Sequence, residues 1–233
     1  LAKEALQNKL YDDAIVKFTA ARDKAVEYGN NEEIVEECQS WVNKTKQAKA
    51  QAIMKTSPAE AVGLLKEVVG SEPDNGTAHL ILGQLLAGTG NIDEAETELN
   101  AAAEHGQKDK AYKVLGTSFL KECQKCQKAG KFSDAVKAAK KSYDYAPSAN
   151  ALKLLATSYK GENKPADAVA AYEQYINEFG AKDAKINEIY YAAATLAQEA
   201  GLKDKAIEYF KKIASDPKLG AYATSQLTAL GAK

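Results

Sequence analysis

One alanine position recurs along this chain, and the repetition constrains the fold more than any other feature. Successive copies are separated by 47, 34, 40, 33 and 38 residues. Four residues after each alanine, on the same face of a helix, the chain carries a second apolar residue. The six alanines are Ala14, Ala61, Ala95, Ala135, Ala168 and Ala206. A repeat of this length predicts pairs of helices stacked side by side, each pair contacting only its neighbours.

The residues around each alanine predict where one helix of a pair ends and the next begins. Five residues before the alanine, three copies have glycine and a fourth has Asn163. Gly and Asn accept the left-handed backbone conformation that closes a helix, so we expect the inner helix to end there. The outer helix then follows, and we expect Ser57, Asp93, Ser133 and Asp204 to cap outer helices with their side chains.

The most regular copy covers residues 76–109, and its spacing resembles the tetratricopeptide repeat. The matching positions are Leu82, Gly83, Leu86, Gly90, Ile92, Ala95, Leu99 and Ala102. The resemblance is moderately strong over residues 76–217 and weaker before them. It implies an all-α fold, a right-handed superhelical solenoid of about six antiparallel helix pairs (TPR-like) with a C-terminal capping helix.

Two regions of this solenoid differ in regularity. Residues 1–75 read as degenerate TPR-like repeats, in which the long first interval predicts lengthened helices at 12–28 and 31–55. Residues 76–233 read as TPR-like repeats followed by the capping helix, which we place at 219–230. We expect both regions to form one continuous solenoid.

Charge and hydropathy exclude several kinds of partner. The chain has 31 basic and 32 acidic residues, so it lacks the positive field that nucleic-acid binding requires. Arg22 is the single arginine, which disfavours bidentate clamps on phosphate or carboxylate groups. No apolar stretch is long enough to span a membrane. Because Met54 is the one methionine, we expect residues before Leu1 to have been removed, which is compatible with a bacterial envelope protein or a cytoplasmic one.

The residues that could carry chemistry are explained better by packing. Cys123 and Cys126 have the spacing of a metal or redox motif, but no second pair accompanies them, so we predict buried thiols without metal. We expect Cys38 in the core as well. His79 stands where the family has a tryptophan, which predicts packing, and His105 lies near the end of an outer helix. The sequence therefore predicts no enzyme activity, no catalytic residue and no cofactor.

The remaining candidate is the concave face that the resemblance implies for the inner helices. Its projected residues are rich in amides, hydroxyls and lysines, which can pair with the polar groups of a peptide. They are Asn43, Lys46, Ala50, Thr77, Leu80, Gln84, Thr117, Leu120, Gln124, Gln127, Asn150, Lys153, Thr157, Lys160, Glu188, Tyr191, Thr195 and Gln198. Within this face, the strip predicted to bind a partner is Gln124, Gln127, Lys153, Lys160, Tyr191 and Gln198.

Two functions remain open at this point. The first is a non-catalytic scaffold that holds a protein or peptide in the concave groove. The alternative is a structural module that stacks through its ends or convex face in a larger complex. We expect a monomer, with weak self-association compatible with the second reading. The family's clamp for chaperone tails is disfavoured, because Thr157 replaces its asparagine and no arginine is available.

Overall fold

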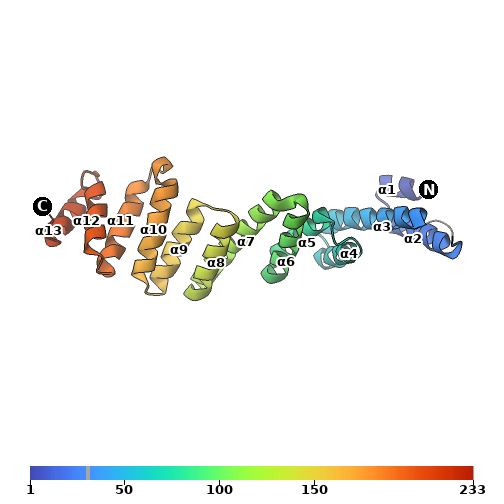
Figure 1. Cartoon of the computed structure of the whole chain (residues 1–233), viewed down its shortest axis with the longest axis horizontal. Helices are drawn as coiled ribbons and strands as arrows, with labels where there is room; N and C mark the ends of the chain where they lie inside the picture. Colours follow the sequence, from blue (N-terminus) through green and yellow to red (C-terminus); the bar gives the residue numbers. More distant parts are fainter. Residues whose placement is uncertain (30–31, 233) are drawn as a thin grey trace. The chain divides into compact units, whose positions relative to one another are not determined.

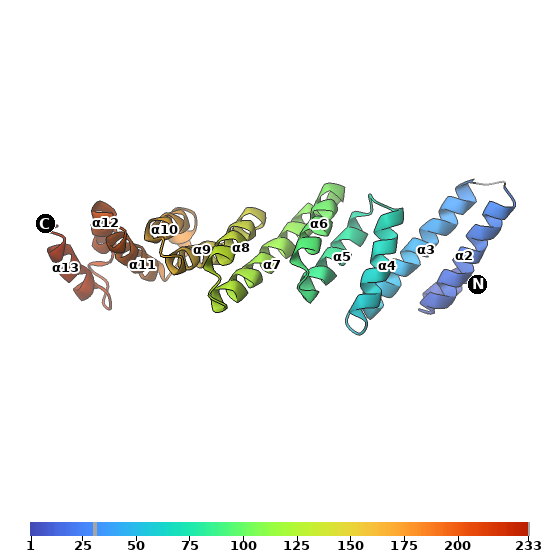
Figure 2. The same cartoon turned by 90° about the horizontal axis from the view of Figure 1, so that it is seen from below.

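The computed structural model describes residues 1–29 and 32–232, and within these ranges it contains helices and no strand. Within each compact unit of the chain, the helices follow one another in chain order (Figures 1 and 2). The chain divides into two compact units, Leu1–Val114 and Leu115–Lys233. Our division at residue 75 rests on the regularity of the repeats, a different criterion, and stays a prediction.

The first unit contains three helix pairs. Its elements are α1 (Ala2–Gln7), α2 (Tyr11–Glu27), α3 (Glu32–Ile53), α4 (Pro58–Ser71), α5 (Gly76–Thr89), α6 (Ile92–Ala102) and the short η1 (Ala103–Gln107). Each α-helix packs mainly on the helices before and after it in the chain. The lengthened helices expected at 12–28 and 31–55 are α2 and α3, although the predicted start at residue 31 lies outside the described residues.

The second unit continues the pairing and ends with a single helix. The division between the units falls inside α7 (Lys108–Lys128). The other elements are α8 (Phe132–Tyr145), α9 (Ala149–Gly161), α10 (Pro165–Phe179), η2 (Gly180–Lys182), α11 (Ile186–Glu199), α12 (Lys203–Ile213) and α13 (Gly220–Ala229). Over the described ranges the chain therefore has the predicted helix pairs and the closing helix.

The recurring alanines are buried in every helix pair. All six are at most 1% exposed, and the residue four positions later is buried in every copy. Glycine permits an even closer approach in places. A Cβ atom on Gly83 of α5 would lie 2.5 Å from Cγ of Leu99 on α6, which is far inside contact distance. Small residues at these positions thus set the spacing of the paired helices.

The turn between inner and outer helix has a left-handed residue in five of the six copies, including the four in which glycine or asparagine predicted one. Gly90, Gly130, Asn163 and Gly201 have positive φ angles, and Lys9 occupies the same position in the first copy with φ of 59°. Thr56 is the exception, because no positive φ is found there in the described chain. A single left-handed residue reverses the chain so abruptly that the outer helix begins almost immediately.

This tight turn makes the capping prediction wrong. Asp93, Ser133 and Asp204 lie within the first turn of their helices, since α6, α8 and α12 begin one residue before them. Ser57 is at the N-cap of α4, but its side chain makes no capping hydrogen bond. Side-chain caps occur instead on inner helices: Asn75 accepts from Ala78 N at the start of α5, and Ser148 accepts from Ala151 N at the start of α9.

Candidate functional site

The six residues predicted to bind a partner lie on three inner helices of the second unit, α7, α9 and α11. Gln124 on α7 and Lys160 on α9 are exposed, and neither side chain makes a hydrogen bond or ion pair with the described residues. The other four are partly buried and contact the next inner helix or the turn that leads to it. The strip therefore contains residues available to a partner and residues that hold the helices together.

Gln127 connects α7 to α9. Its Nε2 donates to the carbonyl oxygen of Leu154 at 3.1 Å, to Thr157 Oγ1 at 2.8 Å and to Ser158 Oγ at 2.8 Å. Ser158 is fully buried, and its hydroxyl also lies 3.7 Å from Cys123 Sγ. This amide is a fixed link between two inner helices.

Lys153 on α9 faces the turn before α11. Its Nζ lies 3.8 Å from Asp183 Oδ2 and 4.8 Å from the ring centre of Tyr175. Tyr175 donates its hydroxyl to the same Asp183 carboxylate at 2.5 Å. This hydrogen bond, with a second one from the Lys185 amide, lowers the pKa of Asp183 below its ordinary value. The charge of Lys153 is thus partly matched by a carboxylate that stays ionised.

Tyr191 and Gln198 connect α11 to the closing helix α13. The Tyr191 ring meets Tyr222 edge-on with centroids 5.5 Å apart, and Gln198 Nε2 donates to Gln226 Oε1 at 2.9 Å. Asn187 at the start of α11 adds a hydrogen bond to Asp216 at 2.8 Å. The closing helix is therefore held by polar and aromatic contacts from the inner helix before it.

Sequence reasoning missed that these links share one spacing. Gln127 and Ser158 are 31 residues apart, Gln198 and Gln226 are 28 apart, and Asn43 donates to Glu72, which is 29 residues on. Each of these separations in sequence is close to the length of one repeat. Polar pairs separated by one repeat are a signal that could have identified these links in advance.

Some projected groove residues of the first unit are covered. Asn43 is 2% exposed, Ala50 is fully buried and Leu80 is 6% exposed, so their assignment to an open face is wrong. Asn43 is covered because its side chain is hydrogen-bonded to both Gln39 and Glu72. Thr77 and Gln84 on α5 are exposed.

The cysteines and histidines pack as follows. Cys123 and Cys126 are 0% and 7% exposed, and burial raises the pKa of both thiols. Cys38 is half-buried, so its assignment to the core is wrong. Among residues 1–29 and 32–232, no group of three or more His, Cys, Asp or Glu side chains could hold a metal ion.

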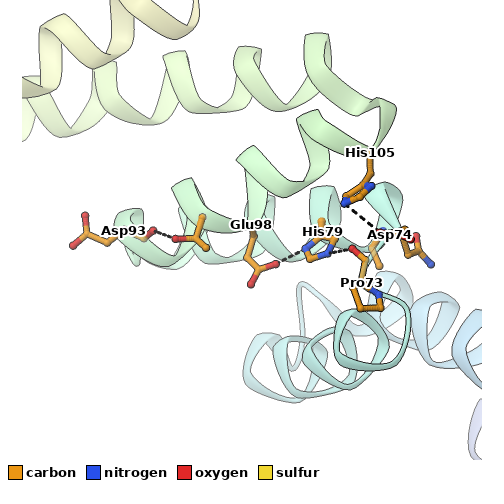
Figure 3. Close-up of polar contacts among 9 residues, drawn as sticks. Pro73, Asp74, His79, Asp93, Glu98 and His105 are labelled. Carbon is orange, nitrogen blue, oxygen red and sulfur yellow. Dashed lines mark hydrogen bonds and ion pairs between the residues drawn. The ribbon is translucent and has the colours of Figure 1, made fainter.

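His79 lies between the two helices of the third pair and the turn before them (Figure 3). Its Nδ1 is 2.6 Å from Glu98 Oε2 on α6, and its Nε2 is 2.9 Å from the carbonyl oxygen of Pro73. A carbonyl only accepts, so Nε2 carries a hydrogen and donates it. His105 lies beside it, 3.6 Å from the exposed Asp74.

Outer helices are linked by tyrosine and carboxylate pairs. Tyr209 of α12 donates to Glu173 of α10 at 2.7 Å, and Lys205 of α12 lies 2.6 Å from the same carboxylate. Burial alone would raise the pKa of Glu173, but these two partners together lower it. Burial, with the hydrogen bond to Glu173, raises the pKa of Tyr209 far above its ordinary value. These groups thus bind α12 to α10.

None of the helices in the described ranges combines the length and the apolar character that a membrane span needs.

Comparison with known proteins agrees with this geometry. Models of the tetratricopeptide repeat match residues 52–116 and residues 153–220, together more than half of the chain. The chain belongs to the tetratricopeptide repeat family. Between the two matches, the fourth copy has the same left-handed turn at Gly130 and the same buried Ala135. Membership of this family makes the chain a scaffold for protein partners.

Solved structures with a similar fold share little sequence with it. A MamA protein is 20% identical, with a TM-score of 0.44, and the match covers 77% of this chain and 94% of that one. The TPR domain of P58(IPK) is 18% identical with a TM-score of 0.44, covering 99% and 63%. A thermophilic TPR protein of Thermus thermophilus is 15% identical with a TM-score of 0.34, covering 81% and 98%. A search of the curated proteins finds no match.

Proposed function

We propose that this chain is a non-catalytic scaffold that binds a protein or peptide partner on the inner-helix face of its second unit. One observation carries the proposal: α7 and α9 bury most of their apolar residues and present Gln124, Thr157 and Lys160 as exposed side chains. Amides, hydroxyls and ammonium groups can pair with the backbone and side chains of a peptide. Nucleic acid is not part of the proposal, because the chain as a whole has a net charge of −1.

The partly buried residues of the strip support binding indirectly. Gln127, Lys153, Tyr191 and Gln198 hold successive inner helices in a fixed register. A face held in this way loses little conformational freedom when a partner binds, which favours affinity. Tyr191 keeps part of its ring exposed and can still contact a partner.

Site-specific cross-linking tests the location. A photoreactive residue placed at Gln124 or at Lys160 should cross-link the same partner, because both positions are exposed on neighbouring inner helices. The matched controls are Lys137 on α8 and Lys211 on α12, which are also exposed but lie on outer helices. Cross-links that form from the outer helices and not from Gln124 or Lys160 would place the partner elsewhere.

Tyr191 provides a quantitative test once a partner is known. Tyr191→Ala should weaken binding by about 1–3 kcal/mol, as expected for an aromatic anchor. Because the ring also contacts Tyr222, the alanine variant loses a contact with α13 as well. Tyr191→Phe keeps that ring contact and serves as the control. Calorimetry on both variants, alongside their circular dichroism, separates lost binding from lost packing.

An assembly role is the second candidate, favoured by apolar residues exposed in the first helix pair and the turn that follows it. Leu10, Val16, Val26 and Tyr28 are between 56% and 73% exposed. Such residues favour contact with a second copy. If these exposed residues mediate assembly, light scattering should show a mass that rises with concentration, and Val16→Asp with Val26→Asp should abolish the rise. A constant monomer mass over the same range would reject it.

A further inference from the structure

The inner helices α7 and α9 carry an excess of lysine that the whole chain does not have. Within the second unit, they contain five lysines and one acidic residue, Glu122. The lysines are Lys121, Lys125, Lys128, Lys153 and Lys160. Over the full sequence, in contrast, acidic residues slightly outnumber basic ones, 32 to 31. The positive charge is therefore local.

Three of these lysines have no partner within the described chain. Lys121, Lys128 and Lys160 are exposed, and their side chains make no hydrogen bond or ion pair there. The other two are engaged, since Lys125 lies 3.2 Å from Glu122 and Lys153 lies 3.8 Å from Asp183. Unmatched charges of one sign on a surface attract ligands of the opposite sign.

The lysines lie on one face of each helix, and those of α7 and α9 occupy matching positions along the two helix axes. Lys121 and Lys128 are two helical turns apart, about 10.5 Å along the axis, and so are Lys153 and Lys160. Because Gln127 contacts Thr157 and Ser158, a residue of α7 lies beside the α9 residue about one repeat later. Lys128 is thus level with Lys160, and Lys121 with Lys153. Gln124 and Thr157 lie between these two levels.

We infer that this patch binds an acidic segment of the partner, an extended stretch rich in Asp and Glu side chains. The inference rests on the proposed function and specifies the chemistry of its ligand. Lysine acts as a point charge without the fixed fork of arginine, so the contacts are electrostatic and sensitive to salt. The exposed Gln124 supplies an amide for the peptide backbone.

The neighbouring inner helix limits the length of this segment. Glu188 and Glu199 are exposed on α11, where they end the positive region. A long polyanion such as a nucleic acid would meet these carboxylates after crossing α9. A short acidic stretch avoids them, which favours a peptide over a nucleic acid.

Binding of defined peptides tests the inference. The probe is a fluorescent, C-terminally amidated peptide of about ten residues, long enough to extend over roughly 33 Å, in which Glu alternates with Ser. Its control replaces every Glu with Gln. Fluorescence anisotropy should show at least about tenfold tighter binding of the Glu peptide at low salt, and the difference should shrink as salt rises.

Charge-neutralised variants locate the site. Lys121→Gln, Lys128→Gln and Lys160→Gln, combined, should remove the preference for the Glu peptide. The matched control combines Lys137→Gln, Lys211→Gln and Lys212→Gln on the outer helices α8 and α12, which lowers the net charge equally. Gln and Lys have similar helix propensity, so both variants should keep their helicity. Equal loss in both variants would overturn the inference.

Further measurements distinguish failure of the acidic-segment inference from failure of the proposed function. If the Gln peptide binds as well as the Glu peptide while Gln124 still cross-links the partner, the scaffold remains and the acidic preference is wrong. Tight binding of a neutral peptide with a free C-terminus would assign the patch to a terminal carboxylate instead. An oligonucleotide of equal charge that binds more tightly than the Glu peptide would also overturn it. If no peptide binds and Gln124 and Lys160 cross-link nothing, both proposals fail.

Discussion

His79 illustrates how single side chains connect the helix pairs. It is 9% exposed, and its two ring nitrogens contact Glu98 on α6 and the Pro73 carbonyl before α5 (Figure 3). We predict that His79→Ala lowers the free energy of unfolding by about 1–3 kcal/mol, because it leaves both partners without their hydrogen bond. Urea denaturation measures this change. His105→Ala is the control and should cost less than about 1 kcal/mol, since Asp74 is 91% exposed.

Asp183 gives the second unit a dependence on pH. Its pKa in the folded chain is lowered, first by the Tyr175 hydroxyl, so it stabilises the fold above its ordinary pKa of 3.8. This contribution is lost as the pH falls through the lower, folded value. Asp183→Asn should therefore lower the melting temperature at neutral pH and should lose less stability than the native chain as the pH falls below about 3.8.

Thermal melts of Asp183→Asn at several pH values measure this difference. Asp144→Asn on α8 is the control, because the Asp144 side chain is exposed near the end of that helix. A native-like acid response in Asp183→Asn would show that the Tyr175 and Lys185 contacts do not stabilise the ionised carboxylate.

At the scale of a helix, two glycines of α5 should respond in opposite directions. A methyl group on Gly83 would lie 2.5 Å from Leu99 Cγ and 3.2 Å from its backbone nitrogen. A methyl group on Gly88 would meet nothing within 4 Å. Gly83→Ala should destabilise the chain by about 1–3 kcal/mol through overpacking, and Gly88→Ala should stabilise it by up to about 1 kcal/mol through helix propensity. Chemical denaturation of both variants measures these changes in the free energy of unfolding.

The elements could be predicted from the sequence because their signals are local. The left-handed turn at Gly130 and the buried Ala135 are separated by five residues and belong to one helix pair. The caps could not be predicted reliably, since a shift of one residue in the start of α8 moves Ser133 from the cap into the first turn. The sequence pattern predicts the position of a helix well, but it predicts the first residue of that helix poorly.

The binding strip was predictable only in part. Exposure of Gln124 and Lys160 follows from helix periodicity alone. The contacts of Gln127 and Gln198 depend on residues about one repeat later, and no pattern within a single copy reveals them. Their amides looked available in the sequence and are hydrogen-bonded in the structure. How a partner uses them stays a prediction.

For the whole molecule, contacts between sequence neighbours predict that damage stays local. Leu65 on α4 is fully buried, so Leu65→Ala should cost about 2–5 kcal/mol. Hydrogen exchange measured by mass spectrometry should become faster in α3, α4 and α5 and remain unchanged in α10 to α12, which belong to the other compact unit. Leu152→Ala on α9 should give the reverse pattern. Uniformly faster exchange in either variant would indicate one cooperative unit.

The same dominance of neighbour contacts has a mechanical consequence. Within each unit, a helix packs mainly on the helices before and after it, so few contacts resist a pull on the chain at any one moment. Under tension in an optical trap, helix pairs should therefore detach one after another at low force and re-form when the load is released. Each unit would then act as a soft spring between whatever is attached to its two ends.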